Sequence, residues 1–71
     1  MANKLEQQYF VGENVLVRLN NGIVIPGTIT EVEKAYDDEE YPINIEDINY
    51  HFIDLKGNNH WCYQDQILEK I

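Results

Sequence analysis

The chain has little of what usually holds a very small protein together. Its one cysteine, Cys62, rules out an intrachain disulfide, and no CxxC or HxxxH spacing offers the ligands of a structural metal site. A chain of 71 residues buries only about 60% of its unfolded surface on folding. We therefore expect one domain that is held together by apolar packing, without cofactor or metal.

Basic residues are also scarce. Five Lys and Arg residues stand against thirteen Asp and Glu residues, which gives a formal net charge of −8. Direct binding to DNA or RNA is disfavoured, because Lys and Arg are needed to neutralise phosphates. The acidic residues either serve solubility or recognise a basic surface of a protein partner.

Long apolar runs are absent as well. No stretch approaches the length of about 20 apolar residues that is needed to span a bilayer. The chain also does not begin with positively charged residues followed by an apolar run, the pattern of a signal peptide. These features predict a cytoplasmic protein with no membrane partner, and a single thiol agrees with a reducing compartment.

The strongest pattern present is that of β-hairpins. Residues 14–19 alternate between two faces and lead into Asn21 and Gly22, which accept turn conformations with positive φ. A two-residue turn there would place Val17 opposite Pro26. The proline and the glycine that follows it predict a bend in the second strand, and a bent strand can serve two faces of a small barrel.

A second hairpin is predicted from residues 48–55 and 60–63, with a turn at Gly57 and Asn58. In the register of a two-residue turn, four aromatic side chains share one face: Tyr50, Phe52, Trp61 and Tyr63. The opposite face then takes Ile53, Leu55 and Cys62. Beyond this hairpin, residues 64–66 suggest a single helical turn, and residues 67–71 a short closing strand.

The pattern stops in residues 34–47, where carboxylates concentrate. Four of them are consecutive, namely Asp37, Asp38, Glu39 and Glu40. Consecutive carboxylates on an extended chain point in opposite directions and lack the alternating ligand spacing of a calcium loop. We expect a solvated acidic loop, of a length that is often functional or disordered.

The whole order resembles a known class of small β domains. A Gly-x-x-Val-x-Val stretch at residues 12–17, a glycine turn, a Pro-Gly strand, two more strands and Gln-Asp-Gln-Ile at residues 64–67 resemble the SH3-like barrels, and among them the Tudor-type domains. The resemblance implies an all-β, five-stranded barrel with a long acidic loop between its second and third core strands. Residues 1–8 would be a loose lead-in. The interior would be filled by Val15, Val17, Ile29, Ile53 and Cys62.

The best-known Tudor activity is not carried over by this resemblance. Methyl-reading Tudor domains hold a methylated Lys or Arg in a cage of aromatic side chains by cation–π contact. The matching positions here are Leu19, Ile25, Asp54 and Lys56 or Gly57, and none is aromatic.

A thiol nucleophile at Cys62, with His60 or His51 as base, is also disfavoured. A cysteine buried between aromatic residues is inert, and a domain of this size has no pocket-sized interior. We expect no enzymatic activity.

Three functional classes remain. The favoured one is a protein-interaction module whose partner-binding residues are Trp61, Tyr63, Phe52, Tyr50, Tyr41, Asp37, Asp38, Glu39 and Glu40. The alternative is an acidic inhibitor, of the kind found in phages and mobile elements, that imitates nucleic acid. The third is a structural subunit that docks by its sheet edge. Because aromatic residues dominate small cores, the aromatic set also has a packing interpretation.

Overall fold

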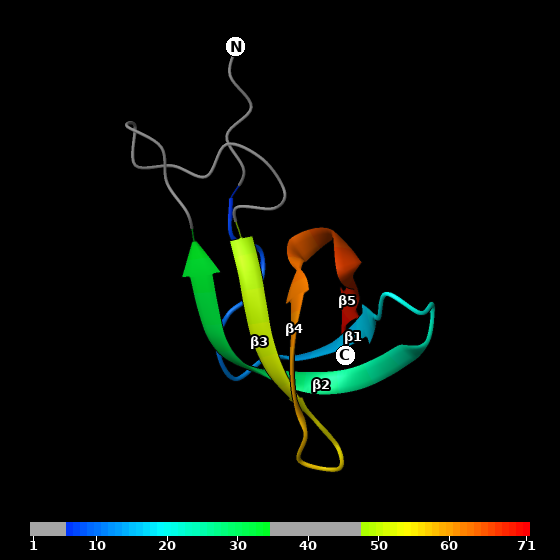
Figure 1. The fold of residues 1–71 in the computed structure, drawn as a ribbon. Helices are drawn as coiled ribbons and strands as arrows, with labels where there is room; N and C mark the ends of the chain where they lie inside the picture. The colour runs from blue at the N-terminus through cyan, green and yellow to red at the C-terminus, as the bar shows by residue number, and fades with distance from the viewer. Residues whose placement is uncertain (1–5, 35–47) are drawn as a thin grey trace.

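The structure is a computed structural model that describes residues 6–34 and 48–71. Five antiparallel strands make up most of these residues. The strands are β1 (Asn14–Arg18), β2 (Val24–Lys34), β3 (Ile48–Asp54), β4 (Asn59–Tyr63) and β5 (Ile67–Lys70), and the 3-10 turn η2 (Gln64–Gln66) precedes β5. They form one sheet in the order β4-β3-β2-β1-β5 (Figure 1). The all-β class and the five strands predicted from the sequence are confirmed.

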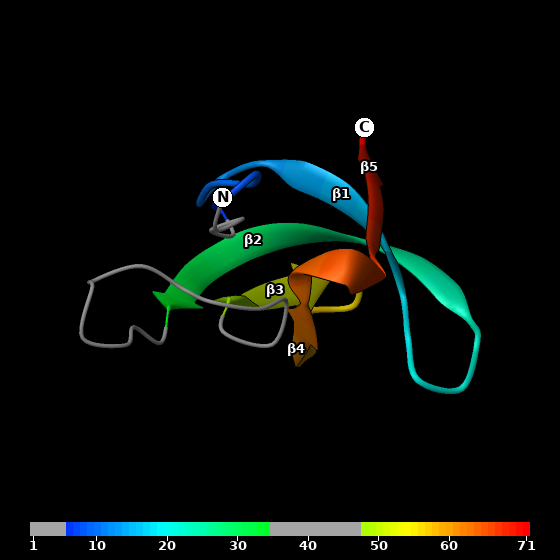
Figure 2. The ribbon, with the colours of Figure 1, turned by 90° about the horizontal axis from the view of Figure 1, so that it is seen from above.

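Strand β2 is long and strongly curved, as Figures 1 and 2 show. It pairs with β1 from Val24 to Thr28 and with β3 from Gly27 to Lys34, with an irregularity in the second ladder between Ile29 and Glu31. Gly27 lies where the two ladders overlap and is buried. The bend expected at this part of the chain is therefore present, and it lets one strand serve both halves of the sheet.

The sheet does not close into the predicted barrel. Strands β4 and β5 are its two edges, and no ladder joins them among the described residues. The side chain of Gln66 bridges from the end of β4 to the end of β1 instead. Its Oε1 accepts from the N–H of Tyr63 at 2.9 Å, and its Nε2 donates to the carbonyl of Arg18 at 3.0 Å. A side chain thus links the ends of β4 and β1 through one backbone group on each strand.

The first hairpin turns through three residues, Asn20, Asn21 and Gly22. The N–H of Gly22 donates to the carbonyl of Leu19 at 2.9 Å, and the N–H of Leu19 donates to the carbonyl of Ile23 at 2.8 Å. Gly22 adopts a φ of 89°, the left-handed conformation that closes such three-residue loops. The extra loop residue shifts the predicted register, so that Val17 lies opposite Ile25 and not Pro26.

The second hairpin also turns through a three-residue loop. Here the difference from the predicted register changes which face of the sheet each side chain occupies. The loop is residues 55–57, with Gly57 at a φ of 88°. Tyr50 therefore pairs with Cys62, and Phe52 pairs with His60. Because side chains alternate along a strand, a register error of an odd number of positions moves a whole strand's set to the other face.

The predicted common face of four aromatic residues is therefore wrong. Tyr50 and Phe52 point into the core with Cys62, whereas Trp61 and Tyr63 lie on the opposite, outer face. Among the described residues, the buried apolar side chains are those of Val15, Val17, Ile29, Ile48, Tyr50, Phe52, Cys62 and Ile67. Burial of the expected Val15, Val17, Ile29 and Cys62 is confirmed. Ile53 is only partly buried, so its predicted place inside is wrong, and Leu55 is exposed.

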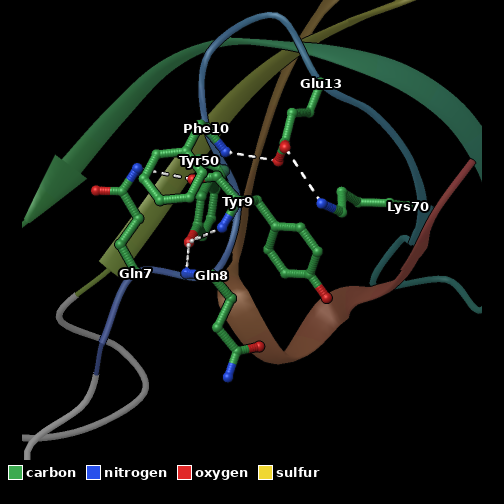
Figure 3. A network of polar contacts seen from close by, with 7 residues as sticks. All are labelled: Gln7, Gln8, Tyr9, Phe10, Glu13, Tyr50 and Lys70. Atoms are coloured by element: carbon green, nitrogen blue, oxygen red, sulfur yellow. Dashed lines mark hydrogen bonds and ion pairs between the residues drawn. The ribbon is translucent and has the colours of Figure 1, made fainter.

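The segment before β1 is attached to this core by the buried Tyr50 (Figure 3). The buried Gln64 provides a second attachment. The Tyr50 hydroxyl donates to Gln64 Oε1 and accepts from the N–H groups of Gln8 and Tyr9 at 3.3 and 3.4 Å. Gln64 Nε2 donates to the carbonyl of Glu6 at 3.0 Å. Glu6 and Gln8 of the expected lead-in thus contact buried core residues, and residues 1–5 lie outside the described part.

Truncating Ile29 tests the core assignment. We expect Ile29→Ala to lower the free energy of unfolding by about 2 to 4 kcal/mol, because a fully buried aliphatic side chain leaves a cavity. Ile53→Ala is the matched control, and we expect it to cost less than half as much, since Ile53 keeps contact with solvent. Urea unfolding measures both, and equal losses would contradict the observed register.

Adding a methyl group at Gly27 tests the close approach of β2 and β3. An alanine Cβ there would lie 2.4 Å from Phe52 Cδ2 and 3.1 Å from the carbonyl oxygen of Ile53. We expect Gly27→Ala to cost about 1 to 3 kcal/mol, as overpacked substitutions do.

A double-mutant cycle separates this clash from a general effect of alanine. Gly27→Ala should cost less in a Phe52→Leu background, because the rigid ring has been removed. Gly22→Ala is the control, since no atom lies within 4 Å of its added Cβ and only its positive φ is penalised. Coupling of equal size for Gly22 and Gly27 would refute the steric explanation.

Candidate functional site

The outer face of β2, β3 and β4 brings acidic, polar and aromatic side chains together in rows across the strands. In one row, Glu31 pairs with His51 and His51 pairs with Trp61. In the next row, Glu33 pairs with Asn49 and Asn49 pairs with Tyr63. We refer to these six residues, Glu31, Glu33, Asn49, His51, Trp61 and Tyr63, as the outer-face cluster.

Trp61 and Tyr63 form the aromatic side of this cluster, on the edge strand β4. Their ring centroids are 5.2 Å apart at an interplanar angle of 84°, an edge-to-face contact. The contact orients both rings, yet 56% of Trp61 remains exposed. Of the predicted aromatic partner-binding residues on described strands, these two reach the surface. Tyr50 and Phe52 do not, because both are buried in the core.

A cleft with a volume of about 310 Å³ lies within the cluster, lined by Glu33, Asn49, His51 and Trp61. His51 Nε2 is 3.1 Å from Glu33 Oε1, close enough for an ion pair but without the alignment of a hydrogen bond. Asn49 Oδ1 is buried and has no hydrogen-bond partner among residues 6–34 and 48–71. The cleft thus combines a carboxylate, an aromatic ring and an unsatisfied acceptor.

Sequence reasoning missed Glu33, Asn49 and His51 as members of a surface site. The misplaced turn had put the even-numbered residues of β3 on the face of Trp61. The available signal was Asp54 three residues before Gly57, because an aspartate that begins a turn accepts hydrogen bonds from the backbone two residues on.

Asp54 fixes the turn that produces this register. Its Oδ1 accepts from the N–H groups of Lys56 and Asn58 at 2.8 and 2.9 Å, and its Oδ2 lies 2.8 Å from His60 Nε2. The hydrogen bond from His60, followed by those from the loop backbone, holds the pKa of the Asp54 carboxyl well below its usual range. His60 in turn stacks on Phe52, with ring centroids 5.0 Å apart. The contact between Asp54 and His60 therefore has a structural role in the turn and beside the core.

The environment of Cys62 disfavours the role of nucleophile that was considered for it from the sequence. Burial, followed by the nearby charge of Asp65, raises the pKa of the Cys62 thiol to about 12. At neutral pH the thiolate that would be the nucleophile is not formed. The expected absence of enzymatic activity stays a prediction.

The predicted acidic part of the partner surface lies outside the described residues. This applies to Asp37, Asp38, Glu39, Glu40 and Tyr41, and to the proposed loop except Lys34, where β2 ends. In the described ranges, no three His, Cys, Asp or Glu side chains are grouped to hold a metal ion.

No family model, curated protein or solved structure matches this chain. Across residues 6–34 and 48–71, none of the helical structure has the length and apolar character needed to cross a membrane. The cytoplasmic location expected from the sequence stays a prediction.

Replacing Asp54 tests its role through pH. A pKa that is lowered by folding means stabilisation that is present above the unfolded value, about 3.9, and lost as pH falls through the folded value. We therefore expect Asp54→Asn to lower the melting temperature at pH 7, and the difference from wild type to shrink as pH falls from 5 towards 2. Glu69→Gln, at an exposed position of β5, is the control without this trend. A difference that is constant with pH would contradict the role of the charged carboxylate.

Proposed function

We propose that this chain is a protein-interaction module that binds a protein partner with its outer-face cluster. Trp61 and Tyr63 anchor the partner, and the surrounding carboxylates match a basic region on it. The all-β domain is the scaffold that holds these side chains on neighbouring strands.

The exposure of Trp61 is the observation that carries this proposal. A tryptophan that leaves 56% of its surface in water, oriented by contact with a second aromatic ring, is a large apolar area available for burial. Tryptophan, tyrosine and arginine dominate the residues that contribute most to protein interfaces. The two rings account for a binding surface better than for packing, because the core of the described residues is filled without them.

Charge supports a basic partner. The chain carries a formal charge of −8, and Glu31 and Glu33 lie on the same face as the aromatic rings. The run from Asp37 to Glu40 follows β2 within a few residues in the sequence. Complementary charge of this kind accelerates association more than it lengthens the life of a complex.

The SH3-like class is part of the same proposal. Three features support it: the strand order β4-β3-β2-β1-β5, a curved β2 shared by both halves of the sheet, and a 3-10 turn before the last strand. Such a domain would be an open form of the class, because the edges β4 and β5 are not paired in the described part.

Binding kinetics of the captured partner test the proposed function. The partner is isolated from the native host by affinity capture with wild-type protein and identified by mass spectrometry. We expect Trp61→Ala to raise the dissociation rate by about 30-fold, the equivalent of about 2 kcal/mol for a central anchor. Replacing the four acids 37–40 by Asn or Ser should slow association, most strongly at low salt.

Leu55→Ala is the matched control, because Leu55 is 85% exposed and lies outside the outer-face cluster. It should leave both rates unchanged. The nucleic-acid imitator makes the opposite prediction, with the acids essential and Trp61 dispensable. If Trp61→Ala unfolds the protein in a circular dichroism melt, the ring is structural and the proposed surface is wrong.

A further inference from the structure

We infer that the cleft lined by Glu33, Asn49, His51 and Trp61 is a binding site for an arginine side chain of the partner protein. The inference rests on the proposed function and adds to it the chemistry of the group recognised. The cleft does not include the positions that match the aromatic cage of Tudor domains, which are Leu19, Ile25, Asp54 and Lys56 or Gly57.

The carboxylate of Glu33 gives the cleft its preference for a cation. Glu33 is exposed, and Glu31 is on the same face one row away. His51 Nε2 contacts Glu33 Oε1 at 3.1 Å without the alignment of a hydrogen bond. The contact places the Glu33 carboxylate beside His51 at the cleft, and 56% of the Glu33 side chain stays exposed to solvent. A phosphate or carboxylate ligand would meet repulsion at the same place.

Asn49 supplies an acceptor that has no partner within the described protein. Its Oδ1 is shielded from water yet accepts no hydrogen bond, and a buried polar atom in this state is unfavourable. Asn49 lines the cleft, so a rotation of its amide would bring Oδ1 towards a donor bound there. A ligand rich in N–H groups would therefore satisfy an atom that the free protein leaves unsatisfied.

Trp61 provides the surface on which a planar cation stacks. Indole is the strongest of the aromatic partners for cations, and guanidinium is found over it more often than ammonium. Trp61 lines the cleft directly, and its contact with Tyr63 keeps the ring oriented.

The three groups together favour arginine over lysine. A guanidinium group is flat and carries five N–H donors in a fixed fork. It can stack on Trp61, pair with the Glu33 carboxylate and donate to Asn49 Oδ1 at the same time. An ammonium group has three donors on a point charge and cannot stack in the same way.

Titration with blocked amino acids, followed by ¹H–¹⁵N NMR, tests the site. The probes are N-acetylarginine methylamide, the lysine equivalent and the neutral citrulline equivalent. We expect saturable shifts of the Trp61 indole N–H and the Asn49 side-chain amide with arginine, at least about five-fold weaker binding of lysine, and none with citrulline. Affinity should be weak, because exposed ion pairs contribute little.

Two variants localise the effect. Glu33→Gln keeps the size of the side chain and one acceptor oxygen but removes the charge, and should weaken arginine binding at least about five-fold. Glu69→Gln on β5 removes the same charge away from the cleft and should leave binding unchanged. Comparison of the two separates the cleft from the general field of an acidic protein.

The inference is overturned if lysine or citrulline binds as tightly as arginine, or if Glu33→Gln and Glu69→Gln have equal effects. Failure of the site is distinguishable from failure of the proposed function. If arginine does not bind but Trp61→Ala still accelerates partner dissociation, the cleft assignment alone is wrong. If arginine binds at Trp61 but the partner is indifferent to Trp61→Ala, the cleft is a cation site and the proposed interaction surface is wrong.

Discussion

The packing of Phe52 over the backbone of Gly27 is the constraint on which the rest of this structure depends. Gly27 lies opposite Val15 in one ladder and Asp54 in the other, so it joins the two halves of the sheet. Any side chain there would occupy the space of the Phe52 ring. With Phe52 directed inward, the alternation of β3 places His51 outward. One close approach thus sets which face of β3 is available for binding.

The hairpin between β3 and β4 then determines which side chains of the edge strand β4 lie on the outer face. The Asp54 carboxylate gathers the N–H groups of the loop and the ring of His60, and so fixes the loop at three residues. With that loop, Cys62 lies in the core and Trp61 lies outside. A loop shorter by one residue would reverse the two. The candidate binding surface is therefore decided by a turn and not by the hydrophobicity of β4, where apolar residues occupy both faces.

The length of this turn is also the feature that the sequence did not predict. The alternation in residues 14–19 and the glycines near each hairpin suffice to predict the two hairpins. They do not specify the loop length, because Asn21-Gly22 suits a two-residue turn as well as the end of a three-residue one. At the first hairpin the error is one position, which places Ile25 instead of Pro26 opposite Val17 and exchanges the faces of the paired β2 residues. On β4 the register error changed the face of Trp61. The aromatic residues Trp61 and Tyr63 alternate with the small apolar Cys62, so the sequence of β4 does not show which of its two faces is buried.

The outer-face cluster is graded in chemistry from the middle of the sheet to its edge: carboxylates on β2, polar groups on β3 and aromatic rings on β4. β4 has only β3 as its ladder partner in the described structure, and an unpaired edge invites association with other strands. Its five residues limit that pairing, and the neighbouring carboxylates repel other acidic chains. A basic partner meets no such repulsion. On the proposed function, the same charges would also favour a basic protein as the partner that approaches Trp61.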